Sequence, residues 1–284
     1  MDGVLLSALA SGAAVVFITV LADRLGGTLG GLLATAPVTT SAAILYLAAA
    51  EGNAAVGGSI LDGAASIFSV LAAMPAYFYV QKWLRDPIPV QVRILVGLLS
   101  YVAVFTIGTL GLNALTPNGY AWVWMPASVL LVLLLVFTFM NAHIPPRFLR
   151  GEKGRLTILE AVIRFAAGFG IIYLVNFVKE LDPSLSTAWA VFPGTFLVSL
   201  AVLGFRNGAA FSARASQGGV LGGLPVAAYI LTLFFVLPLR EGVAWLFLSQ
   251  VPAWVAYFAV LVPLMKWQQR LRPMRLARRE PVQE

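Results

Sequence analysis

Apolar residues gather along this chain in long runs that short polar segments separate. A helix that crosses a bilayer needs about 20 such residues, and these runs reach that length. They predict nine spans, at residues 4–22, 28–50, 54–81, 92–113, 120–141, 157–178, 184–205, 208–238 and 243–265. The pattern therefore predicts an all-α polytopic membrane protein of about nine transmembrane helices.

Spans 2 and 7 each carry a proline at the centre, within the similar segments 34–39 and 190–195. Proline removes a helical hydrogen bond, and the freed backbone groups must then face protein or a water-filled cavity. One interpretation is that each proline only kinks a packed helix whose gap a threonine hydroxyl closes. The other is that the two broken helices together form a substrate site, as in secondary transporters.

The similarity extends well beyond the two prolines. Residues 10–80 align without a gap on residues 166–236, with fifteen identities in 71 positions, where chance in so skewed a composition gives roughly six or seven. The second copy begins five spans after the first, an odd number, so the halves are predicted to be inverted in the membrane. The expected domains are a first repeat at 1–115, a connector at 116–156, a second repeat at 157–266 and a basic tail at 267–284.

Charge supports this topology. Only 11% of the residues are charged and the net charge is +7. If the loops alternate sides, fifteen Lys and Arg residues lie on one side and Lys179 and Arg240 on the other. The positive-inside rule then places the N-terminus outside and the basic tail in the cytoplasm. Attraction to anionic membrane lipids accounts for the basic charge, and no nucleic-acid partner is needed to explain it.

The composition leaves little room for catalysis. The chain has no cysteine and one histidine, which excludes disulfides, thiolate nucleophiles and sites of several histidines. It also has no phosphate-binding loop, no zinc-protease motif and no Gly-x-Ser-x-Gly motif. We expect neither an enzyme nor a cofactor. The functions left open are a secondary transporter, a lipid or polyprenyl-phosphate translocase, and a membrane protein with no transport role.

The segments after the two prolines contain the predicted binding residues. In both spans the half-helix after the proline begins near the midplane, so two positive dipole ends meet there beside several hydroxyl groups. Such a lining suits a small anion or zwitterion. The predicted substrate-binding residues are Thr35, Pro37, Thr39, Thr40, Ser41, Pro193, Gly194, Thr195, Arg214 and Gln217.

Four ionisable residues fall within predicted spans. Asp62 in span 3 is a candidate for proton or cation coupling, or alternatively a structural hydrogen-bonding group. Arg214 in span 8 could bind an anion, pair with Asp62 or extend to the cytoplasmic interface. Glu160 and Arg164 are four residues apart on span 6 and are expected to neutralise each other.

Four segments of the first half resemble the GlpM-like family of small bacterial membrane proteins. They are Ala8-Leu9-Ala10, residues 30–39 (GGLLATAPVT), Glu51-Gly52 and residues 74–80 (MPAYFYV). The second half departs from this pattern, with Asn207-Gly208 in place of Glu51-Gly52 and no counterpart of Pro75. The resemblance implies a duplicated small unit in a prokaryotic cytoplasmic membrane and supplies no substrate. Whether the protein forms a homodimer stays open.

Overall fold

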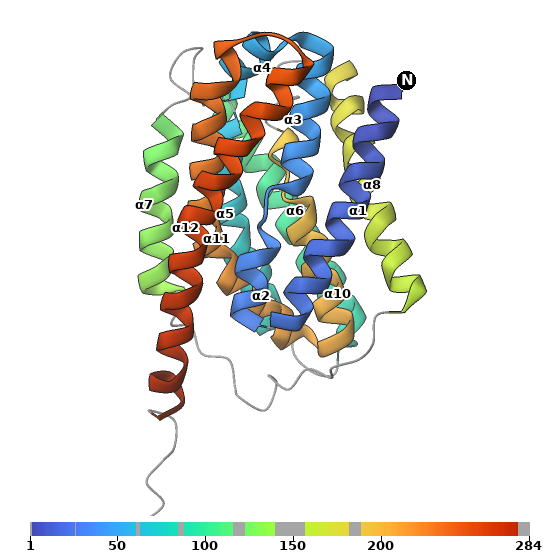
Figure 1. Ribbon diagram of the computed structural model, residues 1–284. Helices are drawn as coiled ribbons and strands as arrows, with labels where there is room; N and C mark the ends of the chain where they lie inside the picture. The colour runs from blue at the N-terminus through green and yellow to red at the C-terminus, as the bar shows by residue number, and fades with distance from the viewer. Residues whose placement is uncertain are drawn as a thin grey trace, which may run out of the picture.

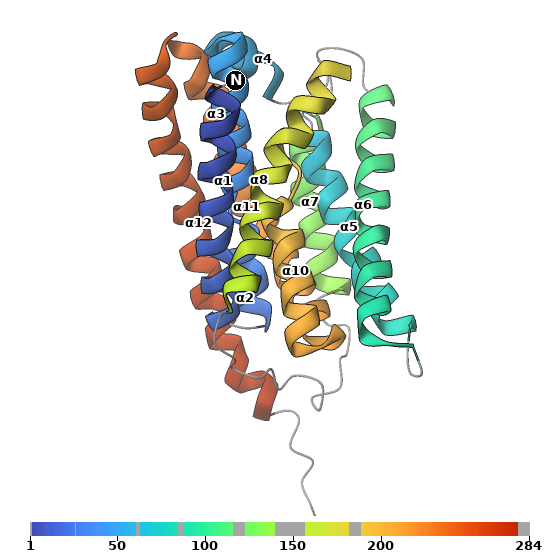
Figure 2. The same ribbon diagram turned by 90° about the vertical axis from the view of Figure 1, so that its right-hand side faces the viewer.

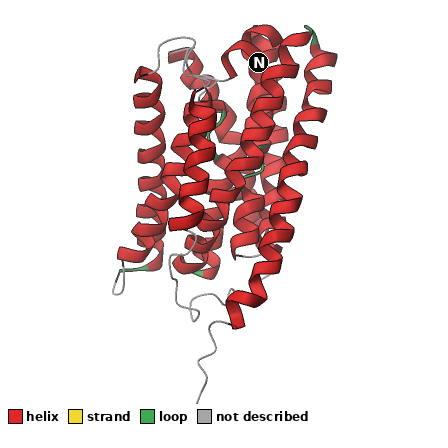
Figure 3. Ribbon diagram, turned by 90° about the vertical axis from the view of Figure 1, so that its left-hand side faces the viewer, coloured by secondary structure: helices red, strands yellow, loops and turns green. Residues whose placement is uncertain are grey.

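The computed structural model describes residues 2–25, 27–60, 63–84, 88–115, 123–139, 157–181 and 189–277. Within these ranges the regular structure is helical, and the helices run roughly alongside one another (Figure 3). Six helical segments are long and apolar enough to cross a membrane: Val4–Leu25, Thr28–Glu51, Val90–Leu115, Ile158–Glu180, Ala209–Leu239 and Val243–Arg270. The chain thus has the character of a multi-pass membrane protein.

The first half begins with α1 (Asp2–Leu25), which runs from the upper to the lower end in Figure 1. The chain returns upward through two shorter helices, α2 (Gly27–Ala34) and α3 (Val38–Glu51). A short α4 (Asn53–Ser59) then leads to α5 (Gly63–Trp83), and α6 (Val90–Leu115) completes the half. The single span expected at 54–81 is therefore divided between α4 and α5.

Helix α7 (Trp124–Thr138) lies between the two halves along the chain, and it packs on α5 and α11. The second half comprises α8 (Ile158–Leu181), α10 (Gly194–Asn207), α11 (Ala209–Val236), the 3-10 turn η5 (Leu237–Leu239) and α12 (Val243–Ala277). Helices α7 and α10 are apolar but shorter than a full span within the described residues. Nine spans consequently stay a prediction.

Helices α1 and α8 lie side by side and run in opposite directions (Figure 2). Gly12 and Gly168 lie where they cross: a Cβ built on Gly168 would be 3.0 Å from the Gly12 Cα. Ser11 donates a hydrogen bond to the Gly168 carbonyl oxygen there, at 2.8 Å. Gly12 and Gly168 are matched residues of the sequence alignment, so the two helices touch at equivalent points.

Glycines also hold the half-helix α2 against α11. A Cβ on Gly31 would overlap the Ala215 carbonyl oxygen, and one on Gly218 would overlap that of Thr28. A Cβ on Gly222 would overlap the side chain of Thr35. Such close approach allows backbone packing without bulky side chains, which is the usual role of small residues between membrane helices. The first broken helix is therefore positioned by α11, which belongs to the other half.

Candidate functional site

The chain breaks at Pro37 and Pro193 in nearly the same backbone conformation. Pro37 has φ −79° and ψ 43°, and Pro193 has φ −81° and ψ 56°. Each proline precedes the first residue of a helix of 14 residues, where its missing N–H costs no helical hydrogen bond. Each of these helices ends before a glycine of positive φ, 95° at Gly52 and 89° at Gly208.

The hydrogen bonds around the two breaks also match. The N–H of Ala36 donates to Leu33 O at 2.9 Å, and that of Val38 donates to Ala36 O at 2.8 Å. The corresponding bonds at the second break, 156 residues later, run from Phe192 to Trp189 at 2.9 Å and from Gly194 to Phe192 at 2.8 Å. The two halves therefore share local structure as well as sequence at this point.

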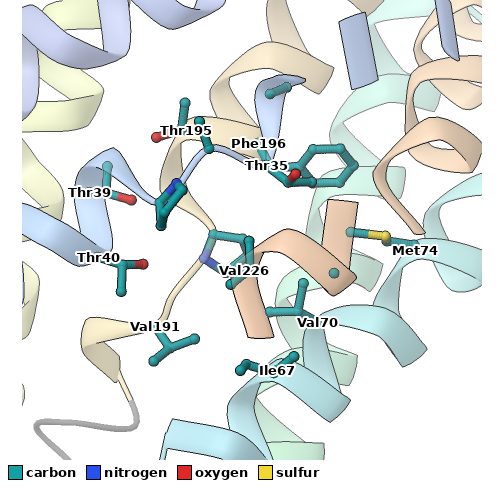
Figure 4. Close-up of a pocket in the computed structure, with 15 residues that line it drawn as sticks. Thr35, Thr39, Thr40, Ile67, Val70, Met74, Val191, Thr195, Phe196 and Val226 are labelled. Atoms are coloured by element: carbon teal, nitrogen blue, oxygen red, sulfur yellow. The ribbon is translucent and has the colours of Figure 1, made fainter. Parts of the chain in front are cut away.

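A small cavity of about 30 Å³ lies between the two breaks, in the interior of the bundle (Figure 4). Twelve of its fifteen lining residues form six pairs that are 156 positions apart: Thr35 and Val191, Pro37 and Pro193, Thr39 and Thr195, Thr40 and Phe196, Ile67 and Gly223, Val70 and Val226. The other three are Ala34, Ala36 and Met74. Both halves therefore line one cavity with matched positions.

The cavity lies at the N-termini of α3 and α10. The first helical bonds of these helices run from Ser41 N to Pro37 O at 2.7 Å and from Leu197 N to Pro193 O at 2.9 Å. The N–H groups of Thr39 and Thr195 come before Ser41 and Leu197, the first donors of the two helices. No carbonyl group of α3 or α10 therefore accepts a helical hydrogen bond from them. Neither helix has a side-chain cap. Two positive dipole ends and backbone donors thus meet at the cavity.

Thr195 brings a further donor. Its side chain is buried, with 2% of its surface exposed, and its hydroxyl has no hydrogen-bond partner among the described residues. Figure 4 shows this hydroxyl turned toward the side of the cavity where the Thr39 hydroxyl lies. A buried hydroxyl without a partner costs about 1–3 kcal/mol. Among the residues that line the cavity, Thr195 is the one with such a hydroxyl.

Thr35 differs from Thr195, because its hydroxyl donates to Leu32 O at 2.7 Å and so closes part of the gap in α2. Ser41 directly follows the lining residue Thr40. Its hydroxyl donates to Gln250 Oε1 at 2.8 Å, and that oxygen also accepts a 2.6 Å bond from Tyr229. Ser41 therefore belongs to a buried contact of α3 with α11 and α12 and not to the cavity lining.

Arg214 and Gln217 are likewise outside the cavity lining. Arg214 donates to Gln217 Oε1 at 3.2 Å, and Gln217 Nε2 donates to the Phe139 carbonyl oxygen at 2.9 Å. The two side chains thus connect α11 with the end of α7. Gly194 is the first residue of α10, and a side chain there would overlap Ile171. Asp62 lies outside the described residues.

Sequence reasoning missed several lining residues, although a signal existed for some. Val70 and Val226 are identical residues of the aligned repeat, but their apolar side chains gave no indication of a binding site. Extending the alignment past residue 80 also matches Tyr101 of α6 with Tyr257 of α12, and both are fully buried. The Tyr101 hydroxyl lies 3.4 Å from Val70 O, next to the cavity lining.

Charged residues join the ends of α1 and α8 to the broken helices. At the lower end Arg164, which is fully buried, pairs with Asp23 and donates to the Thr19 hydroxyl at 3.0 Å. Arg206 of α10 lies 3.8 Å from Asp23 and also 3.8 Å from Glu160. The expected partner of Arg164 was therefore wrong: Glu160 exchanges hydrogen bonds with Thr157 at the start of α8.

At the upper end, Lys179 of α8 lies 2.7 Å from Glu51, the last residue of α3. Lys179 is the repeat counterpart of Asp23, because the two are 156 residues apart. Each of these residues therefore pairs with the end of the half-helix that belongs to the opposite half. The signs of the charges are reversed between the two ends.

Comparison with family models, with curated proteins and with solved structures finds no match for this chain.

Proposed function

We propose that the protein is a secondary transporter for a small anionic or zwitterionic solute, which binds in the cavity between the two breaks. The proposal depends on one observation above all: one cavity between the two breaks is lined by six pairs of repeat-related residues and by two helix N-termini. Transporters with inverted repeats bind their substrates at such a position.

The same proposal includes nine spans in two inverted halves. It is supported by the opposite directions of α1 and α8, and by their contact at Gly12 and Gly168. If a two-fold axis lies in the membrane plane, it passes near this contact and through the cavity. A site on such an axis can be opened to either face by equivalent motions of the two halves.

We further propose that the charged contacts at the two ends of α1 and α8 close the two access routes. The Asp23 contacts hold α10 at the lower end, and the Lys179–Glu51 pair holds α3 at the upper end. Opening one face then breaks one set of contacts while the other stays formed. The lower set includes the fully buried Arg164, whose removal would leave Asp23 without its buried partner.

Uptake by proteoliposomes tests the transport function. We expect wild-type protein to accelerate uptake of at least one of chloride, formate, phosphate, glycine and glutamate, and Thr195→Val to slow it strongly. Thr232→Val is the matched control, because the Thr232 hydroxyl is used within α11, where it donates to Ala228 O at 2.8 Å. Uptake of all five solutes at the rate of protein-free liposomes would contradict the proposal.

Cysteine labelling tests the topology, because the chain has no cysteine of its own. Single cysteines at Asn118 and Asp182 should react with an impermeant reagent from outside the cell, and those at Asp86 and Gly151 should not. Labelling of the Gly151 position from outside would rule out nine spans in inverted halves.

Asp62 is the proposed coupling residue. If it carries a proton with the solute, Asp62→Asn should leave exchange of solute across the membrane intact but abolish uptake that an imposed pH gradient drives. Asp62→Glu keeps the carboxylate and serves as the control. Uptake by Asp62→Asn that still responds to the gradient would assign the coupling elsewhere.

A further inference from the structure

The chemistry of the cavity lining narrows the solute class, an inference that rests on the proposed function. None of the fifteen lining residues is charged. The positive potential at the site therefore comes from the N-termini of α3 and α10, each equivalent to roughly half an elementary charge. Together they balance about one negative charge.

The backbone around the breaks favours an anion over a cation or a zwitterion. At the first break the carbonyl oxygens of Leu33 and Ala36 accept hydrogen bonds from the turn, and that of Leu32 accepts one from Thr35. At the second break those of Trp189 and Phe192 do the same. These acceptors are used, whereas the N–H groups of Thr39 and Thr195 lie before the first helical hydrogen bonds. The Thr195 hydroxyl also has no partner among the described residues.

The size of the cavity sets a second limit. At about 30 Å³ the cavity is small, but it admits more than one water-sized group. Most of the remaining lining is apolar, with Ile67, Val70, Met74 and Val226 among its members. An apolar lining does not compensate a second, unbalanced charge.

We infer that the site binds a monovalent anion of a few atoms, such as a halide, nitrate or formate, in direct contact with the Thr195 hydroxyl. A divalent anion would leave about one charge unbalanced inside the bundle. A zwitterion would bring an ammonium group for which the lining offers no carboxylate. The unpartnered Thr195 hydroxyl then donates its hydrogen bond to the bound anion.

Binding to the purified protein in detergent tests this inference. The probes are sodium chloride, bromide, nitrate and formate, compared with sodium sulfate and with glycine, at constant ionic strength maintained with gluconate. Binding is read as a saturable rise in the thermal unfolding temperature, because a ligand stabilises the state that binds it. We expect saturable stabilisation by at least one monovalent anion and none by sulfate or glycine.

Variants at position 195 link the binding to the cavity. Thr195→Val should weaken the tightest monovalent anion about tenfold or more, because it removes a hydrogen bond to a charged group. Thr195→Ser should retain the affinity, and Thr232→Val should leave it unchanged. The serine variant also shows whether an altered side-chain volume alone disturbs the fold.

The outcomes separate this inference from the proposed function. If sulfate or glycine binds as tightly as the monovalent anions and in a manner that depends on Thr195, the inference is overturned and the cavity keeps its role as a solute site. If no probe shows binding that depends on Thr195, both the inference and the proposed site are overturned.

Discussion

The two halves of the protein share a backbone at their breaks but differ in the side chains placed on it. Residues 37 and 193 have the same conformation, and glycines follow both half-helices at the same spacing. Yet Thr40 has Phe196 as its counterpart, and Thr35 has Val191. The backbone that makes the site is thus common to both halves, whereas most of the hydroxyl groups come from the first. A solute that binds there, as proposed, would therefore meet unequal surfaces.

The largest expected effect on stability comes from the charged contacts at the lower end. Arg164→Met leaves Asp23 without its buried partner, which should lower the free energy of unfolding by about 3–5 kcal/mol. Unfolding in mixed detergent micelles measures this change. The double variant Asp23→Leu with Arg164→Met removes both charges and should recover much of the loss. A double variant no more stable than Arg164→Met would show that the unpaired Asp23 carboxylate is not the cause of the loss.

The glycines after the half-helices test whether the two breaks are equivalent. Alanine is strained at the positive φ of Gly52 or Gly208, so Gly52→Ala and Gly208→Ala should each cost about 1–3 kcal/mol of unfolding free energy. Gly58→Ala is the control, because a Cβ at Gly58 meets no atom of the described residues within 4 Å. Clearly unequal losses of unfolding free energy in Gly52→Ala and Gly208→Ala would show that the two breaks are not equivalent.

Thr35→Val makes the first break resemble the second, where valine stands at the equivalent position. It removes the hydrogen bond to Leu32 O, so stability should fall by about 1 kcal/mol. Solute affinity should change little, because this hydroxyl already has a partner within its own helix. Thermal unfolding of this variant, titrated with the tightest-binding anion, measures both its stability and its affinity for the anion. A large loss of affinity would assign Thr35 a direct role in binding.

The smallest effect is expected at the upper end. Lys179 and Glu51 have 23% and 31% of their side-chain surfaces exposed, and pairs of this kind contribute about 0–1 kcal/mol. Lys179→Met should therefore change the unfolding free energy only slightly, in contrast to Arg164→Met. An equal loss of unfolding free energy in both variants would show that the charged contacts at the two ends contribute equally to stability.

The sequence predicted the breaks better than the side chains around them. Pro37 and Pro193 act through local backbone geometry, so their effect can be read from neighbouring residues. Arg164 instead finds its partner Asp23 141 residues away in the chain, where helical spacing suggested Glu160. The exclusion of Arg214 and Gln217 from the cavity likewise depends on how α11 is rotated against α7. Single-sequence periodicity carries little information about that rotation, because α11 is apolar around most of its circumference.

A cysteine at position 195 tests the central claim most directly, that the cavity is a solute site open to either face in turn. The Thr195→Cys variant would contain one thiol, since the native chain has none. In oriented proteoliposomes a small impermeant thiol reagent should label it slowly from each face, because reaction requires the cavity to open. Exposed cysteines at Gly58 and Gln269 verify access to the two surfaces. The predicted result is labelling of the Thr195→Cys variant from both faces. No labelling of this variant from either face, while the two surface cysteines react, would contradict the account.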